Sequence, residues 1–303
     1  MRWQHAWLIG LMIVLPSAAS AAEPGEAGAL FLRFGLGARA SAMGDAYAAV
    51  GEDASSVFWN PGAMPAVLGT RLTLVHNEYF QSLRFEQAAI THETKWGTFG
   101  FMFTGLYMDD MDRYDDAPAS SPLGTFGAYD VAAALAYGRY IVPNLAVGIS
   151  IKPVYQRLDE LSASGLAFDA GIYHVSRIEG VKLAATVANL GTPMKFETEE
   201  YALPRYARLG ASFEREVASI DGRVLLTFDA MFPNDDGVRE HFGGEYSYKR
   251  MLALRAGYKV GYDSQGATFG FGVVYREIGL DYAFLPVKNE LGDSHRFALN
   301  FSF

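Results

Sequence analysis

Ser294-His-Arg-Phe-Ala-Leu-Asn-Phe-Ser-Phe303, the last ten residues of the chain, alternate between large apolar side chains and smaller or polar ones. Successive side chains of a β-strand point to opposite faces of its sheet, so this alternation predicts a strand with one apolar and one polar face. Strands of soluble sandwiches also show such a pattern, so the fold class depends on the rest of the chain. The apolar face consists of Phe297, Leu299, Phe301 and Phe303.

The same alternation recurs along the chain from Thr70 onward, in about 14 segments that mostly span ten or more residues. Soluble strands usually have five or six residues, whereas a tilted membrane-spanning strand needs about 9–11. The lengths therefore predict an all-β fold, a transmembrane antiparallel β-barrel of about 14 strands over residues 70–303. The segments are 70–79, 84–93, 95–107, 128–141, 144–157, 164–177, 179–190, 203–215, 221–233, 239–249, 251–262, 266–276, 277–287 and 294–303.

The connections between these segments alternate in length. Every even-numbered segment is followed almost at once by the next, whereas the connections after odd-numbered segments are mostly longer, led by 108–127 and 191–202. A bacterial outer-membrane barrel with both termini in the periplasm has short periplasmic turns and longer external loops. The parity therefore places the chain in the outer membrane, with outer-membrane lipid around it. The terminal strand ending on Phe303 resembles the signal that the barrel assembly machinery reads on its substrates.

Composition and the N-terminus agree with export. The chain has 303 residues, half of them hydrophobic, no cysteine and a net charge of −9. No apolar run reaches the roughly 18 residues of a spanning helix, and clustered basic residues that would bind nucleic acid are lacking. Arg2, an apolar run and the small residues 17–22 predict a secretory signal peptide over residues 1–22. The mature protein would leave the cytoplasm without a disulfide.

Alternation also assigns the two faces of the predicted barrel. In segment 251–262 the side that holds Leu254, Tyr258 and Tyr262 is apolar and is expected to face lipid. Charged residues on the other side are expected in the lumen, either as a polar translocation path or, as we favour, as cross-strand ion pairs such as Asp281 with Arg296. The predicted lumen residues are Lys152, Asp169, Arg208, Asp229, Glu245, Arg255, Lys259, Asp281 and Arg296.

The sequence offers little support for metal or catalytic chemistry. Acidic residues gather in the predicted external loops, at 109–116, 197–200 and 235–236, and calcium binding there is the alternative to a merely solvated acidic surface. Six scattered histidines lack zinc-site spacing, and no nucleophile motif is present. We therefore predict no metal, no cofactor and no enzyme.

Residues 23–69 differ from the barrel segments. Small residues such as Ala38, Ala42 and Ala46 stand at helix-compatible spacing, and glycines interrupt them. A barrel of about 14 strands has a lumen wide enough for a channel. The segment is therefore predicted to be a short helical N-terminal plug.

A resemblance to known families rests on the stretch from Phe31 to Gly62, FLRFGLGARASAMGDAYAAVGEDASSVFWNPG. It strongly resembles the N-terminal signature of the PorV/PorQ outer-membrane proteins and is more distantly similar to the FadL fatty-acid transporters. Both families imply a 14-stranded barrel with an N-terminal plug. The order Asn60-Pro61-Gly62-Ala63 inverts the usual Ala-Gly of the motif. The positions that match it, our candidate functional residues, are Arg39, Met43, Gly44, Asp53, Asn60 and Pro61.

The two families imply different functions. The PorV/PorQ resemblance implies a non-catalytic barrel for protein secretion or surface attachment in a type IX-like system, with a secretion translocon and cargo proteins as partners. The FadL resemblance implies the alternative, a channel for hydrophobic small molecules. For the motif residues, a purely structural role in plug folding is the competing interpretation. The polar lumen of the later segments leads us to expect partner binding, with the solute channel as runner-up.

Overall fold

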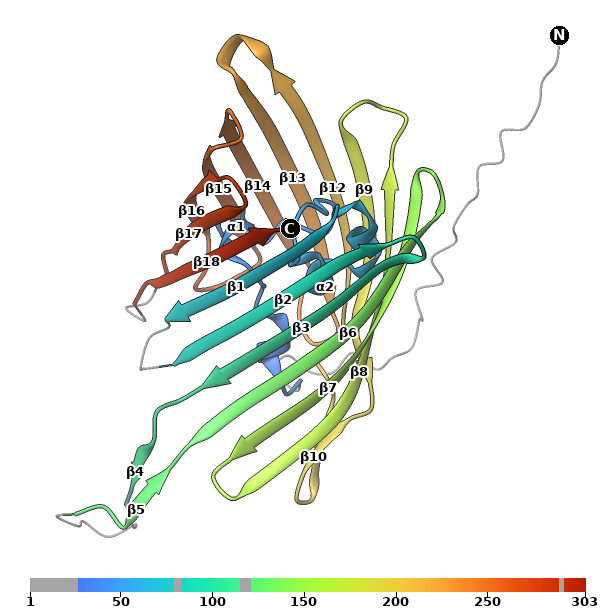
Figure 1. Ribbon diagram of the computed structural model, residues 1–303. Helices are drawn as coiled ribbons and strands as arrows, with labels where there is room; N and C mark the ends of the chain where they lie inside the picture. Colours follow the sequence, from blue (N-terminus) through green and yellow to red (C-terminus); the bar gives the residue numbers. More distant parts are fainter. Residues whose placement is uncertain (1–26, 79–82, 115–120, 289–291) are drawn as a thin grey trace.

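The computed structural model describes residues 27–78, 83–114, 121–288 and 292–303, which form a closed antiparallel barrel of 14 strands (Figure 1). The prediction of an all-β barrel with this strand number is confirmed. The predicted signal peptide, 1–22, lies outside the described residues. Among those described, no helix is long and apolar enough to cross a membrane.

The barrel closes through its two terminal strands. β1 pairs with β18, with Leu74 opposite Leu299, and every other wall strand pairs with its neighbours in sequence. The wall strands are β1 (Thr70–Glu78), β2 (Arg84–Thr94), β3 (Gly97–Tyr107), β6 (Ala128–Val142), β7 (Leu145–Leu158), β8 (Leu161–Val175), β9 (Val181–Gly191), β12 (Tyr206–Val217), β13 (Gly222–Pro233), β14 (Arg239–Tyr248), β15 (Leu252–Val260), β16 (Ala267–Tyr275), β17 (Ile278–Leu285) and β18 (Ser294–Ser302).

The two ends of the barrel differ in the length of their connections. Short turns gather at one end, and the longer connections gather at the other, where only β7 and β8 are joined by a two-residue turn, Asp159-Glu160, within the described chain. We call these the short-turn end and the long-loop end. The segments 108–127 and 191–202, predicted as loops, contain two additional hairpins at the long-loop end, seen at the bottom of Figure 1. They are β4 (Met111–Arg113) with β5 (Gly124–Phe126), and β10 (Met194–Phe196) with β11 (Glu199–Tyr201), whose three-residue strands are too short to show an alternation.

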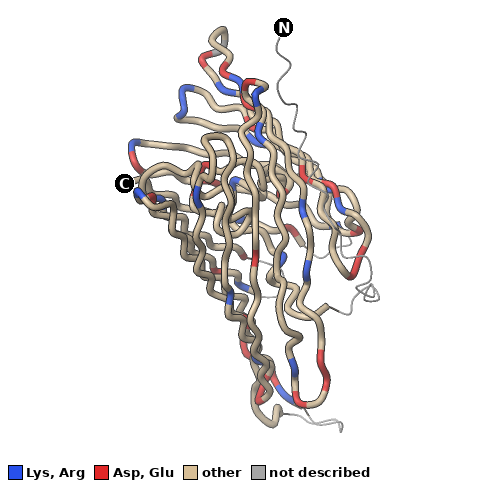
Figure 2. The backbone as a smooth tube through the Cα atoms, turned by 90° about the vertical axis from the view of Figure 1, so that its right-hand side faces the viewer, with Lys and Arg blue, Asp and Glu red and all other residues tan. Residues whose placement is uncertain are grey.

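The outer surface of the wall is apolar. Outward side chains such as Phe101, Leu254 and Phe269 are exposed, while the charged residues of β15, Arg255 and Lys259, turn inward. Figure 2 shows charged residues gathered toward the two ends and only scattered along the strands. One face assignment was wrong: Tyr262 lies beyond the end of β15, and its hydroxyl contacts Nε2 of the buried His241 at 3.2 Å.

The N-terminal segment lies inside the barrel, where Figure 1 shows α1 and α2 enclosed by the strands. It contains η1 (Leu30–Arg33), α1 (Ala38–Ala42), α2 (Ser56–Trp59) and η2 (Pro61–Ala66). α1 packs against β15 to β18, and η2 packs against β6 to β8 on the other side of the lumen. Glycines with positive φ, at Gly37, Gly44 and Gly51, let the chain turn between these short pieces. The buried core of the molecule thus lies between this segment and the inner wall.

Candidate functional site

Asn60 ties the N-terminal segment to the wall of the barrel. Its side-chain amide donates to the carbonyl oxygens of Ala48, at 3.1 Å, and Ile172 on β8, at 3.0 Å, and its Oδ1 accepts from the amide of Gly62 at 2.9 Å. Asn60 therefore serves as the N-cap of η2 and anchors it to β8. From Asn60 the chain continues along the wall as η2, which ends at Ala66.

The wall strands that face Asn60 and Pro61 carry glycines, which allow the backbone of the N-terminal segment to approach the wall closely. A Cβ atom on Gly171 of β8 would stand 1.9 Å from Asn60 Oδ1, and one on Gly148 of β7 would stand 2.2 Å from Pro61 O. Real Cβ atoms do not come this close. Glycine in a strand often marks the close approach of another backbone, and these positions do so.

Met43 and Gly44 make the equivalent contact on the other side of the lumen. A Cβ on Gly257 of β15 would lie 2.1 Å from the amide nitrogen of Gly44, and one on Gly243 of β14 would lie 2.5 Å from Met43 O. The Gly44 amide also donates to Thr268 Oγ1 on β16 at 3.0 Å. The segment therefore touches the wall on both sides at backbone distance and leaves no room there for a side chain.

Arg39 lies at the centre of a buried ion-pair cluster. Its guanidinium binds Glu245 of β14, with Nε to Oε2 at 2.7 Å, and Glu52 at 2.7 Å, and it lies 3.9 Å from Asp53. Tyr47 donates to Asp53 Oδ2 at 2.5 Å and lies beneath the guanidinium at 5.8 Å. Two residues of the N-terminal motif, Arg39 and Asp53, thus meet in one cluster.

The cluster shifts the pKa of its members inside the lumen. Burial disfavours the ionised form of Glu52, but the charges of Arg39 and Arg223 outweigh burial and lower its pKa to about 2. For Arg39 burial opposes the charge, yet Glu245 and Glu52 raise its pKa well above the usual value. Glu52 and Arg39 are therefore both charged at neutral pH.

A second group of ion pairs fixes the turn between Gly44 and Ala48. Asp229 of β13 accepts from the amides of Tyr47 and Ala48, at 2.9 and 3.0 Å, and pairs with Arg208 of β12 at 3.1 Å. Lys259 of β15 pairs with the Asp45 carboxylate. Although burial alone would raise the pKa of Asp45, Lys259 and other nearby cations lower it to about 2.

The remaining predicted lumen residues are also buried on the inner wall. Lys152 pairs with Asp169 at 3.0 Å across β7 and β8, and Arg255 pairs with Asp281 at 2.6 Å. Arg296 donates to the carbonyl oxygen of Gly35 and to Ser41 Oγ, both at 2.6 Å.

The example pair named from the sequence, Asp281 with Arg296, is out of register by two positions. Asp281 stands opposite Ala298, and Arg296 stands opposite Ala283. The Asp281 carboxylate binds Arg255, on the far side of β16, and accepts from Asn300 at 2.8 Å. Inward glycine at Gly272 leaves the space through which Arg255 reaches Asp281, since a Cβ there would stand 2.4 Å from Asp281 Oδ1.

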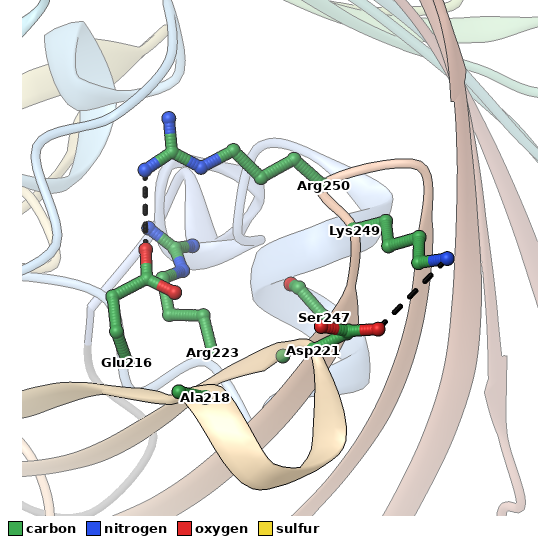
Figure 3. A pocket seen from close by; sticks show the side chains of 8 residues that line it. Glu216, Ala218, Asp221, Arg223, Ser247, Lys249 and Arg250 are labelled. Carbon is green, nitrogen blue, oxygen red and sulfur yellow. Dashed lines mark hydrogen bonds and ion pairs between the residues drawn. The ribbon is translucent and has the colours of Figure 1, made fainter.

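Sequence reasoning missed Arg223, which extends the cluster toward the short-turn end. Its guanidinium binds Glu52, Glu245 and Glu214, at 3.0, 3.0 and 3.1 Å. Arg223 also lines a groove of about 600 Å³ between the β12–β13 and β14–β15 turns (Figure 3). At the groove, Arg250 pairs with Glu216 at 3.1 Å. Arg223 could have been predicted, because it lies in segment 221–233 on the same side of the strand as the predicted lumen residue Asp229.

An apolar group on the long-loop side of the lumen was also missed, and we call it the outer apolar cluster. It packs the side chains of η1 against the inner faces of β2, β6, β7 and β8 and against the 191–205 loop. Phe34 lies edge-on to Phe85 at 5.5 Å in its rim. The members are Ala29, Phe31, Leu32, Phe85, Ala132, Val154, Ala163, Ala167, Met194 and Leu203.

The wall beside this cluster is weakened at Pro153. The β6–β7 ladder pairs Ala132 with Val154 and Leu135 with Ile151 in one register, and the two positions between them, opposite Pro153 and Lys152, form no ladder pair. Proline has no amide hydrogen, so it cannot donate to the ladder at this point. Because Ala132 and Val154 belong to the outer apolar cluster, the interruption lies directly behind it.

Comparison with solved structures identifies the fold. The Ralstonia pickettii toluene transporter TbuX superposes with a TM-score of 0.64 at 13% identity, over 89% of this chain and 98% of that one. The Pseudomonas putida toluene transporter TodX gives 0.61 at 13% identity, covering 88% and 96%. A Pseudomonas aeruginosa FadL homologue gives 0.53 at 12% identity, covering 88% and 97%. No protein-family profile and no curated protein sequence matches the chain.

The chain therefore has the FadL-like outer-membrane barrel fold. The similar structures are described as transporters or as a FadL homologue, and none of these three is described as an enzyme. They support the FadL-like part of the resemblance, and they give no support to PorV/PorQ membership or to a role in secretion. Among the described residues no group of histidine and carboxylate side chains could hold a metal ion.

Proposed function

We propose that this protein is an outer-membrane channel for hydrophobic small molecules. The observation that carries the proposal is the outer apolar cluster, which lies on the long-loop side of the lumen beside the gap in the β6–β7 ladder at Pro153, above a larger apolar cluster that α1, α2 and the wall fill. An apolar solute gains free energy by leaving water for such a site, by about 25 cal/mol per Å² of apolar surface buried.

The geometry favours a path through the wall over a path straight through the lumen. Below the outer apolar cluster, the N-terminal segment touches Gly148 and Gly257 at backbone distance and is held by the Arg39 cluster. A solute that reached the cluster would meet close-packed plug side chains and buried ion pairs, which leave it no open path. We propose that the solute leaves instead beside Pro153, where the β6–β7 ladder lacks the hydrogen bond that proline cannot donate. The N-terminal segment, in this proposal, acts as the plug that directs the solute sideways.

The solved structures with a similar fold also favour a channel for hydrophobic solutes. TbuX and TodX are described as toluene transporters, so this fold accommodates apolar solutes. The hypothesis of protein secretion or surface attachment, which the N-terminal motif suggested, has no equivalent support. The motif residues Arg39, Met43, Gly44, Asp53, Asn60 and Pro61 are proposed to hold the plug in place, and Phe297, Leu299, Phe301 and Phe303 to serve assembly, as the terminal alternation predicts.

The proposal is tested by uptake of a labelled monoaromatic hydrocarbon into cells whose outer membrane contains the protein. We expect faster uptake than with an empty vector, and no faster uptake of a hydrophilic sugar. Ala132→Leu, which fills the outer apolar cluster, should reduce uptake of the hydrocarbon, whereas Ala211→Leu on the outward face of β12 should not. Uptake equal to the vector control would refute the channel. Co-purification of stoichiometric secretion partners from native membranes would support the secretion hypothesis instead.

A further inference from the structure

Two polar side chains stand unpartnered beside the outer apolar cluster. Gln87 of β2 and Thr104 of β3 face the lumen, and their exposed fractions are 4% and 2%. Neither the amide oxygen nor the amide nitrogen of Gln87 has a hydrogen-bond partner, and neither does the Thr104 hydroxyl. Burying such groups without partners costs about 1–3 kcal/mol each, so they need an explanation.

Their position in the barrel connects them to the proposed solute site. Gln87 stands directly opposite Thr104, Thr104 opposite Ala132, and Ala132 opposite Val154, so the four form one inward row across β2, β3, β6 and β7. Ala132 and Val154 are members of the outer apolar cluster and flank the interruption at Pro153. The unpartnered pair therefore lies at one end of the row and the weak point of the wall at the other.

We propose that Gln87 and Thr104 form a polar subsite that recognises a neutral hydrogen-bonding group on an otherwise hydrophobic solute. The inference rests on the proposed channel function and names its substrate class: an amphiphile that carries one hydroxyl, carbonyl or amide group. The Gln87 amide supplies two donors and an acceptor, and the Thr104 hydroxyl supplies one donor and accepts as well. Both side chains are uncharged, so they match a neutral group, and the solute's apolar part would lie along Ala132 and Val154.

The apolar side chains of η1 and of Phe34 would have to make room for such a solute. Phe31 and Leu32 occupy the outer apolar cluster, and Phe34 packs on Phe85, two residues from Gln87 in β2. The contacts of these three side chains are apolar, so a solute of similar size can replace them, while Arg33 keeps the end of η1 in place through its ion pair with Asp235. The hydrogen bonds to Gln87 and Thr104 would then be gained only in the solute-bound state, and they would favour the amphiphile over a pure hydrocarbon.

The test compares ethylbenzene with 2-phenylethanol, whose main difference is one hydroxyl group. Binding to the purified barrel is measured for the wild type, for Gln87→Leu with Thr104→Val, and for the control Thr91→Val. Thr91 is also buried with an unpartnered hydroxyl, but it stands opposite Gly100 and away from the row. Expressing each result as a ratio to the wild type cancels the partition of each solute into detergent.

We expect the double variant to lose about tenfold in affinity for 2-phenylethanol, the effect of roughly one buried hydrogen bond, while ethylbenzene binds as well or better. Thr91→Val should change neither. Unchanged 2-phenylethanol binding in the double variant, or an equal loss for both solutes, would overturn the subsite while leaving the channel intact. If no variant and no wild-type sample bound either solute, both this inference and the proposed function would fall.

Discussion

Replacing Gly257 by alanine tests whether the plug is held by backbone contact with the wall. The added Cβ would lie 2.1 Å from the Gly44 nitrogen and 2.3 Å from the Met43 carbonyl carbon. Ordinary contact begins at 3.4 Å, so the plug backbone must retreat by about 1.3 Å, and no side-chain rotation can relieve the clash because both atoms belong to the main chain. Overpacking of this kind costs about 1–3 kcal/mol.

The retreat should also weaken a hydrogen bond. The Gly44 amide donates to Thr268 Oγ1 at 3.0 Å, and losing a buried bond of this kind adds about 1 kcal/mol. The total expected loss in the free energy of plug unfolding is about 2–4 kcal/mol. Trp59 is buried within the plug, so its fluorescence in a Trp96→Phe background reports the plug during denaturant titration.

Gly244→Ala is the matched control. It adds the same atom to a glycine of the neighbouring strand β14, which stands opposite Ala256 and faces outward. Its nearest neighbour would be Leu226 Cδ2 at 3.7 Å, an ordinary contact. We expect Gly244→Ala to change the unfolding free energy by less than about 0.5 kcal/mol. Gly257→Ala should also raise the ionic conductance of the barrel in planar bilayers. Equal stability and equal conductance of the two variants would refute the backbone-contact argument.

Three further outcomes follow from the same contacts. Arg39→Met removes one of the two cations that Glu52 and Glu245 share and leaves Arg223 in place, so the plug should lose about 1.5–3 kcal/mol in denaturant titration, and a loss below about 0.5 kcal/mol would contradict the cluster. Glu52 and Asp45 have pKa values lowered to about 2, so their stabilisation is complete above pH about 4.5 and is lost as the pH falls toward 2; a Glu52→Gln variant should show a shallower acid transition in a pH titration of plug fluorescence. Pro153→Ala restores an amide donor to the β6–β7 ladder, so hydrocarbon uptake should fall several-fold, and unchanged uptake would argue against a path through that part of the wall.

The barrel was predictable because its defining signal is local. Membrane strands keep a two-residue period over ten or more residues, and all 14 wall strands were found within a few residues of their predicted bounds. The hairpins of β4 with β5 and β10 with β11 were missed because three residues carry no period. The side of the wall to which a residue points can therefore be predicted wherever the strand is long. The prediction for Tyr262 was wrong because β15 ends before it, at Val260.

The interior was less predictable because partners across a lumen depend on register and on distance. Alternation placed Arg255, Asp281 and Arg296 on one side of the wall, but Asp281 is reached by Arg255 across β16 only because Gly272 leaves the space. The cations that bind Glu52 come from α1 and β13, which are far apart in sequence. Inward glycines such as Gly148, Gly171 and Gly257 were the available signal for a plug that touches the wall. Glycine weakens a strand, and its presence there often marks a site where another backbone approaches closely.

The contacts divide the N-terminal segment into a fixed part and a part that a solute can displace. From Arg39 to Pro61 the segment combines backbone contact with glycine, hydrogen bonds to the wall and ion pairs, so moving it would expose several buried charges at once. The η1 part is held by apolar packing and, at its end, by Arg33, which binds Asp235 and the carbonyl oxygen of Pro204 at the long-loop end. An apolar solute can replace apolar packing but cannot replace an ion pair. The solute path is therefore expected to run along η1 and out beside Pro153, and the fixed part of the plug keeps the lumen closed while it does so.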